Sequence, residues 1–310
     1  SVIVVLALIA AATAAGVLLE RRDRAAAHRA ADEIVRLIVW VLMPFVILFV
    51  APRLSLSGGV GAGLLLAFAE LTVVGMLAFF IAGRVLGLSR PVTGSVVCAV
   101  ILANTGYLGV PLVGALLGHD AIPDAVAWDA LVSNTMLYLP GFAVGAALGT
   151  KAGEGGRDRA IAFLTRNPVL YALIAGLLIP SSWSPDALFE AAKFVAGYGV
   201  LPLGFFLLGV NLMEERDELG QRSLMPPFTA AVGVVCALRL AVAPALLVLL
   251  VLASGASIPD AFFVQAAMPS GINTLVVAHT FGLDLRTAAG AIAWSTVLAI
   301  VGAAFASGLV

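Results

Sequence analysis

The chain has 310 residues, of which 62% are hydrophobic and 11% are charged, and its mean hydropathy is +1.10. Few soluble domains reach these values, so the composition predicts a protein embedded in a lipid bilayer through many apolar segments. The formal net charge of −1 gives no indication of nucleic-acid binding, and we expect no nucleic-acid partner.

Ten apolar runs follow one another along the chain, and most approach or exceed the ~20 residues with which a helix crosses ~30 Å of hydrocarbon. They cover residues 2–19, 36–51, 60–84, 92–117, 125–149, 168–183, 189–212, 227–253, 260–282 and 287–308. The expected fold is therefore an all-α polytopic membrane protein with ten transmembrane helices.

The polar, glycine-rich connection 151–167 divides the runs into five and five. We expect residues 1–150 to form a first five-helix repeat and residues 168–310 a second one, joined by this connection in the cytoplasm. Because an odd number of spans per half makes the halves enter the membrane from opposite sides, the two repeats are predicted to be inverted.

Two pairs of prolines support the alignment of the repeats. Pro44 and Pro202 are 158 residues apart, and both lie in the second run of their half. Pro111 and Pro269 have the same separation, and both lie in the fourth run. The runs therefore correspond one to six, two to seven, and so on.

The basic residues indicate the orientation. With the N-terminus outside, fourteen of the seventeen Lys and Arg residues fall in odd-numbered connections and two in even-numbered ones. Since cytoplasmic loops carry an excess of Lys and Arg, both termini are expected outside the cytoplasm, in a protein of the cell membrane.

Glycine and proline interrupt two of the runs. The fourth contains Asn104-Thr-Gly-Tyr-Leu-Gly-Val-Pro111, and the ninth contains Met268-Pro-Ser-Gly-Ile-Asn273. An interior proline removes a backbone hydrogen bond, so a break facing lipid would leave polar backbone in hydrocarbon. Breaks that line a cavity are tolerated, and one in each half is typical of secondary transporters whose substrate site lies where two discontinuous helices cross.

These two stretches, together with Ala278-His-Thr-Phe-Gly-Leu-Asp284, resemble the auxin efflux carrier family, which includes the plant PIN-FORMED proteins and many bacterial permeases. The resemblance implies a scaffold of spans one, two, six and seven, a transport domain of the other six, and an elevator mechanism. It also implies a crossing of spans four and nine at Pro111 and Pro269, a homodimer formed through the scaffold, and organic anions as substrates. The long hydrophilic central loop of many plant members is absent here.

The broken helices also favour an anion site on physical grounds. Each break ends one half-helix and begins another, which exposes unpaired N–H groups and the positive end of a helix dipole near the bilayer midplane. A carboxylate fits such a place without a full counter-charge. The residues expected to line the site are Asn104, Tyr107, Gly109, Pro111, Asn134, Tyr138, Pro269, Ser270, Gly271 and Asn273. The asparagines can equally serve as packing contacts between helices, and the tyrosines as ordinary core aromatics.

Glu70 and Arg239 are the only ionisable residues that we place near the middle of spans, the third and the eighth. They form either a structural ion pair or, if Glu70 is unpaired, a site for a transported proton. Coupling to Na⁺ is less well supported, although neutral oxygens of Ser133, Asn134 and Gln265 could form a cation site.

Other chemistry has little support in the sequence. Cys98 and Cys236 lie in apolar runs with no Cys, His or carboxylate at ligand spacing, so we expect neither a metal site nor a cofactor. The sequence contains no HExxH, no phosphate-binding loop and no nucleophile elbow, which argues against an enzyme. The leading interpretation is an alternating-access transporter of small organic anions, such as auxin-like or other carboxylates. The alternative is a membrane sensor or receptor that binds a carboxylate with the same fold.

Overall fold

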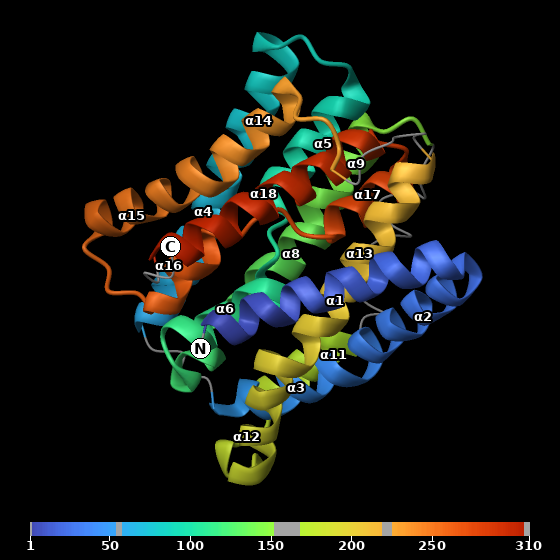
Figure 1. Ribbon diagram of the computed structural model, residues 1–310. Helices are drawn as coiled ribbons and strands as arrows, with labels where there is room; N and C mark the ends of the chain where they lie inside the picture. Colours follow the sequence, from blue (N-terminus) through green and yellow to red (C-terminus); the bar gives the residue numbers. More distant parts are fainter. Residues whose placement is uncertain (1, 54–57, 152–167, 219–224, 307–310) are drawn as a thin grey trace.

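The computed structural model describes residues 2–53, 58–151, 168–218 and 225–306, and these residues are almost entirely helical (Figure 1). The α-helices are α1 (Val2–Arg22), α2 (Arg24–Leu37), α3 (Met43–Val50), α4 (Gly58–Phe80), α5 (Arg90–Ile101), α6 (Val110–Leu116), α7 (Ile122–Ala127), α8 (Asn134–Met136), α9 (Phe142–Leu148), α11 (Pro168–Leu178), α12 (Asp186–Phe194), α13 (Val200–Glu218), α14 (Ala230–Ala237), α15 (Ala243–Ser254), α16 (Asp260–Ala266), α17 (Asn273–Phe281) and α18 (Leu285–Ala306). Of the predicted connection 151–167, only Lys151 is among the described residues.

Seven helical segments of the described chain are long and apolar enough to cross a membrane. They are Ile3–Arg22, Arg24–Arg53, Gly58–Val85, His119–Leu148, Asp186–Glu214, Ala230–Ser254 and Leu285–Gly302. The fourth run is instead split into two shorter helices, Arg90–Ile101 and Thr105–Leu116, and the ninth into α16 and α17. A multi-pass helical membrane protein is thus confirmed, whereas ten helices in two inverted repeats remain a prediction.

Wide helical turns precede the first pair of aligned prolines. A π-helical turn, η1 (Ile38–Leu42), comes two residues before Pro44, and another, η9 (Val195–Gly199), comes three residues before Pro202. Proline has no N–H to donate, and its ring clashes with the carbonyl group four residues earlier in a regular α-helix. A wider turn opens the hydrogen-bond ladder where this carbonyl lies. Both prolines are therefore accommodated by the same local structure.

The helices form two groups that face each other (Figure 1). The first group contains α1, α2, α3, α11, α12 and α13, at the lower right of the view, and the second contains α4 to α9 and α14 to α18. The groups meet where α6 contacts α1 and where the π-helical turn η4 (Thr105–Gly109) contacts α13. A site between them would change its surroundings if one group moved relative to the other.

Small residues bring α1 and α13 close together inside the first group. A Cβ atom on Gly16 would collide with the carbonyl oxygen of Phe206, and one on Gly209 would collide with that of Thr13. Lipid tails are as apolar as leucine side chains, so helices in membranes associate largely through such close backbone packing. This contact packs α1 firmly against α13.

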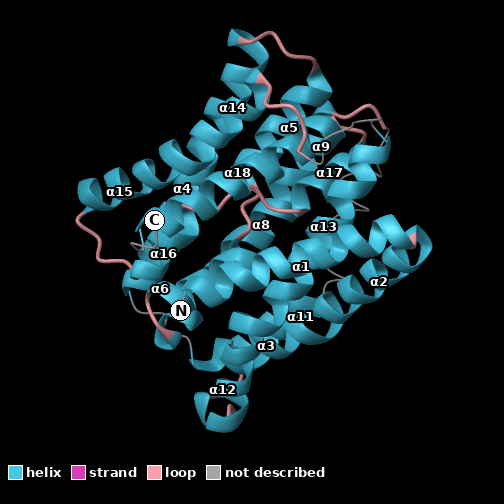
Figure 2. Ribbon diagram, viewed as in Figure 1, coloured by secondary structure: helices cyan, strands magenta, loops and turns pink. Residues whose placement is uncertain are grey.

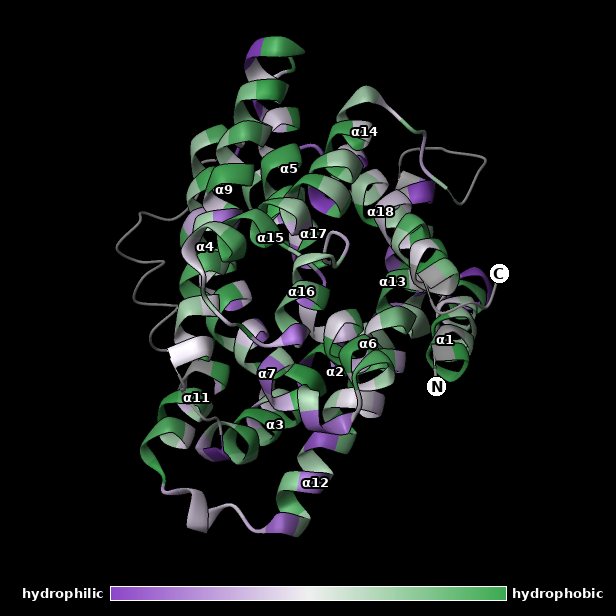
Figure 3. Cartoon of the chain, turned by 90° about the vertical axis from the view of Figure 1, so that its left-hand side faces the viewer, coloured by the Kyte–Doolittle hydropathy of each residue, from purple (hydrophilic) through white to green (hydrophobic). Residues whose placement is uncertain are grey.

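The outer surface suits a bilayer. Apolar residues cover the sides of the helices in Figure 3, whereas hydrophilic residues concentrate at ends such as α12. Leu65, Leu178 and Leu252 are each more than 70% exposed. In water, so many large exposed side chains would form an aggregation-prone surface, but in hydrocarbon their exposure costs little.

Candidate functional site

The two predicted breaks lie against each other in the interior, where short loops interrupt the helices (Figure 2). Ala103 and Ser270 form an isolated antiparallel β-bridge. The N–H of Asn104 donates to the carbonyl oxygen of Pro269 at 2.7 Å, and the N–H of Gly271 donates to that of Leu102 at 2.7 Å. Each unwound segment thus satisfies polar backbone groups of the other, which the hydrocarbon could not do.

The crossing was expected at Pro111 and Pro269, but on the first of the two helices it lies at Ala103. Pro269 is adjacent to the bridge, but Pro111 lies within α6, eight residues beyond Ala103. The helix already restarts at Thr105, because the π-helical turn η4 leads directly into α6 and accommodates the proline that follows. Gly109 lies in the same turn, where a Cβ atom would collide with the side-chain oxygen of Gln265.

Arg239 secures the opposite ends of the broken helices. Its Nε donates to the carbonyl oxygen of Met268 at 2.8 Å, and its other nitrogens donate to the carbonyl oxygens of Val100, at 3.3 Å, and Ala266. Val100 and Ala266 lie at the carboxyl ends of α5 and α16, and Met268 follows α16 by two residues. A cation is favoured there by the helix dipole, and unpaired acceptors need donors. Arg239 therefore caps both preceding half-helices at once.

Glu70 completes this arrangement. Its Oε1 lies 3.8 Å from Nη1 of Arg239, and both side chains are fully buried. Neither carboxylate oxygen of Glu70 has a hydrogen-bond partner among the described residues. The structure therefore supports the ion-pair interpretation, in which the carboxylate balances an arginine that is held by backbone carbonyls.

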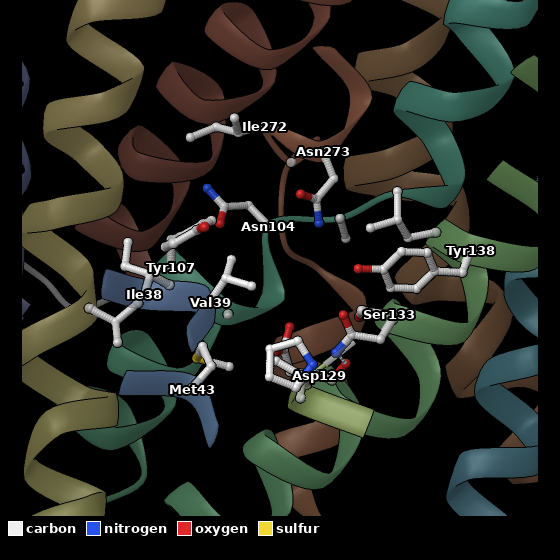
Figure 4. Close-up of a pocket in the computed structure, with 18 residues that line it drawn as sticks. Ile38, Val39, Met43, Asn104, Tyr107, Asp129, Ser133, Tyr138, Ile272 and Asn273 are labelled. Carbon is white, nitrogen blue, oxygen red and sulfur yellow. Dashed lines mark hydrogen bonds between the residues drawn. The ribbon is translucent and has the colours of Figure 1, made fainter. Parts of the chain in front are cut away.

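A pocket of about 140 Å³ opens on the other side of the crossing (Figure 4). It lies between the two groups of helices and has both polar and apolar walls. Its lining residues are Ile38, Val39, Met43, Ala103, Asn104, Gly106, Tyr107, Asp129, Ser133, Asn134, Leu137, Tyr138, Pro168, Val169, Val200, Gly271, Ile272 and Asn273. Since pockets for drug-sized ligands measure roughly 300–1,000 Å³, this one suits a small ligand.

In each broken run, the helix that follows the break begins at this pocket. Asn104, Gly106 and Tyr107 belong to the start of the helix Thr105–Leu116, and Gly271 and Asn273 to the start of α17. The positive ends of two helix dipoles are therefore directed at one small cavity. No lysine, arginine or histidine is among the lining residues that the structure describes, so neutral donors and helix dipoles are the groups available to an anion.

Six of the ten residues predicted to bind substrate line the pocket. They are Asn104, Tyr107, Asn134, Tyr138, Gly271 and Asn273. In Figure 4 the amides of Asn104 and Asn273 lie in one part of the pocket, and the hydroxyl of Tyr138 points into it. The side-chain oxygen of Asn104 is buried without a hydrogen-bond partner in the described chain, so it can accept from water, whereas the amide nitrogen is the donor for an anion.

The other four predicted residues are close to the crossing but outside the pocket lining. They are Gly109, Pro111, Pro269 and Ser270. The hydroxyl of Ser270 donates to the carbonyl oxygen of Ala99 at 2.7 Å, and its N–H donates to Oγ of Ser295 at 3.1 Å. These groups hold the loop in place and are not directed at a ligand.

The structure does not assemble the cation site suggested by Ser133, Asn134 and Gln265. Ser133 and Asn134 line the pocket, but Gln265 is buried away from it and donates Nε2 to the carbonyl oxygens of Thr105, at 3.3 Å, and Ala125, at 2.9 Å. Asn134 likewise donates to the carbonyl oxygen of Asp129 at 3.1 Å. Because Gln265 lies outside the pocket lining, the three residues do not converge on one site.

Sequence reasoning missed Asp129, so the statement that Glu70 and Arg239 are the only ionisable residues near the middle of spans was incomplete. The fifth run was expected to begin at residue 125, which places Asp129 near the membrane surface. The helical segment begins already at His119, so Asp129 lies ten residues into it and lines the pocket. The signal was present in Pro123 and Asp124, since proline and acidic residues are favoured in the first turn of a helix.

Comparisons with known proteins agree with a transporter. Residues 160–307 match the model of a family described as membrane transport protein. The chain is 23% identical over 284 residues to an uncharacterized transporter of Methanocaldococcus jannaschii, with 86% of the chain and 85% of the relative covered. It is 26% identical over 284 residues to an uncharacterized transporter of Methanothermobacter thermautotrophicus, with 86% and 84% covered. These similarities support a membrane transport protein and not an enzyme.

Proposed function

We propose that the chain is a secondary transporter of small organic anions that binds its substrate in the pocket at the crossing of the broken helices. The observation that carries the proposal is the convergence of two helix N-termini on one small pocket with amide donors and with no basic side chain among its described lining residues. Neutral donors hold a carboxylate without the strong binding of a full counter-charge, so the anion can leave again on the other side.

The walls of the pocket suggest the kind of anion. Tyr107 and Tyr138 contribute aromatic rings, and Ile38, Met43 and Val200 contribute apolar surface. A small monocarboxylate with an apolar or aromatic body fits this combination, because its charge can lie at the helix N-termini and its body against the rings. Auxin-like carboxylates such as indole-3-acetate and simpler ones such as benzoate belong to this class.

The two groups of helices suggest how the substrate moves. We infer that the second group carries the crossing and its ligand past the first group, in an elevator-like form of alternating access, with the first group forming the contact of a homodimer. The tight packing of α1 on α13 supports a rigid first group. The distribution of basic residues supports a cell-membrane protein with both termini outside the cytoplasm.

Ligand binding tests the proposal directly. Purified protein is screened by thermal shift with acetate, benzoate, indole-3-acetate and malate, because a ligand that binds the folded state raises its apparent stability. Asn104→Ala and Asn273→Ala are expected to weaken binding of the best ligand about 10- to 150-fold, since a hydrogen bond to a charged group is worth about 1.5–3 kcal/mol. Asn211→Ala, a half-buried asparagine of α13 outside the pocket, is the matched control. Equal affinity in all three variants would contradict the assigned site.

A further inference from the structure

Among the described residues, Asp129 is the one charged side chain that lines the pocket. The hydroxyl oxygen of Thr105 lies 2.6 Å from Oδ1 of Asp129 and 2.7 Å from the hydroxyl oxygen of Ser133. A threonine hydroxyl has one hydrogen, so when it donates to the carboxylate it accepts from Ser133. A short chain of hydroxyl groups thus fixes the carboxylate beside Gly106, at the start of the helix Thr105–Leu116.

Among the described residues, no cation lies within ion-pair distance of this carboxylate. Besides Asp129, the titratable residues of the pocket lining are Tyr107, from η4, and Tyr138, from the same helix as Asp129. The first group contributes only apolar residues to the lining, through η1, α3, α11 and α13, and the loop before α17 contributes Gly271 and Ile272 followed by Asn273. Glu70, on α4, is paired with Arg239 at the carboxyl ends of the other half-helices.

A bound anion therefore meets a second negative charge in a pocket of about 140 Å³. Two carboxylates in one small site of low polarity cannot both stay ionised, and the usual outcome is that one of them takes up a proton. The substrate binds near Asn104 and Asn273, while Asp129 is held by Thr105 in another part of the pocket (Figure 4). Asp129 is the group that stays with the protein and can return its proton to water.

A second, smaller cavity adjoins Asp129. It measures about 10 Å³, is lined by Asp129, Val126 and Ala196, and shares Met43 and Val200 with the pocket. A void of this size is close to the ~10–15 Å³ that one water molecule occupies. The side chain lies at the contact between the two groups of helices, where relative movement would change its access to water.

On this basis we propose that Asp129 is the proton-binding residue that couples anion transport to protons: the anion binds when Asp129 is protonated, and the two move together as a neutral pair. This inference rests on the proposed function and assigns to Asp129 the role that the sequence had suggested for Glu70. The competing explanation is that Asp129 only stabilises the helix N-terminus at Thr105, in which case its ionised form is needed in every state.

The test is the number of protons taken up per bound benzoate, measured by titration calorimetry in buffers of different ionisation enthalpy. For the wild type, the dissociation constant is expected to rise about tenfold per pH unit at alkaline pH, with close to one proton taken up. Asp129→Asn is expected to bind benzoate without proton uptake and with an affinity independent of pH. Asp129→Glu should keep the proton uptake, and Asp124→Asn, an acidic residue of the same helix that lines neither cavity, is the matched control.

The outcomes separate the two proposals. Benzoate binding by the wild type without proton uptake between about pH 5 and pH 9, or unchanged uptake by a folded Asp129→Asn, overturns the role of Asp129 and leaves the anion site standing. Failure of the wild type to bind benzoate or indole-3-acetate at any pH contradicts the proposed function and the coupling with it. If Asp129→Asn does not fold, the wild-type proton count and its retention in Asp129→Glu and Asp124→Asn decide the question.

Discussion

The double cap formed by Arg239 makes a quantitative prediction about stability. Arg239→Gln removes the cation from Glu70 and leaves carbonyl groups of α5 and α16 without their donors in a fully buried environment. Removing one partner of a buried ion pair costs about 3–5 kcal/mol, and the loss of a donor to each buried carbonyl adds to this. The expected loss in free energy of unfolding is therefore at the upper end, about 5 kcal/mol.

The partner should behave differently. In Glu70→Gln, Arg239 keeps its carbonyl acceptors, so the expected loss is smaller, about 1–3 kcal/mol. The direct attraction across 3.8 Å is about 4 kcal/mol at an effective dielectric constant of about 20, and desolvation offsets part of it. The double variant should therefore lose about 2 kcal/mol less than the sum of the single variants. Arg239→Lys keeps the charge but not the fork of donors, and should fall between the wild type and Arg239→Gln.

Unfolding by SDS in mixed micelles, followed by circular dichroism, measures these differences in one series. The reasoning fails if Arg239→Gln is no less stable than Glu70→Gln, because the carbonyl contacts would then contribute nothing. It fails equally if the coupling energy is below about 0.5 kcal/mol, which is the deviation from additivity seen for independent sites.

Three further outcomes are expected. Gly271→Val should abolish ligand binding measured by thermal shift, because even a Cβ atom there would lie 2.9 Å from the carbonyl oxygen of Ala103 and would push the two loops apart; wild-type affinity would show that the bridge is dispensable. Gly209→Ile should separate α1 from α13 and lower the unfolding midpoint, while Gly58→Ala, where a Cβ meets no atom within 4 Å, should not; equal midpoints would contradict the close packing. Cysteine at Ala256 should react with an impermeant thiol reagent added to intact cells, and cysteine at Gly155 should not; the opposite pattern would reverse the proposed orientation.

The breaks could be predicted from sequence because their cause is local. Glycine and proline close together in an apolar run favour a break in the helix, and Asn104 and Asn273 flank the two broken segments, so a position beside a cavity could be predicted for them. Tyr107 and Gly271 follow for the same reason. What could be read in advance is therefore the part of the site that the backbone itself creates.

The rest depends on tertiary contacts that leave no local pattern. Ser270, like Asn273, is a polar residue of the second break, but its hydroxyl donates to the carbonyl oxygen of Ala99. Gln265 is a suitable ligand by residue type, yet it holds together α16, α7 and η4. Asp129 was missed because hydropathy places the start of its helix too late, since the first turns carry a proline and acidic residues.

The most direct test of the central claim is transport through the crossing. Purified protein in liposomes is loaded with unlabelled benzoate, and uptake of labelled benzoate by exchange is compared for the wild type, Asn273→Ala and the control Asn211→Ala. The account predicts rapid exchange by the wild type and the control, and at least tenfold slower exchange by Asn273→Ala at subsaturating benzoate. Exchange that is equally fast in all three proteins would contradict a substrate site at the crossing, and tight binding without any exchange by the wild type would indicate a receptor in place of a transporter.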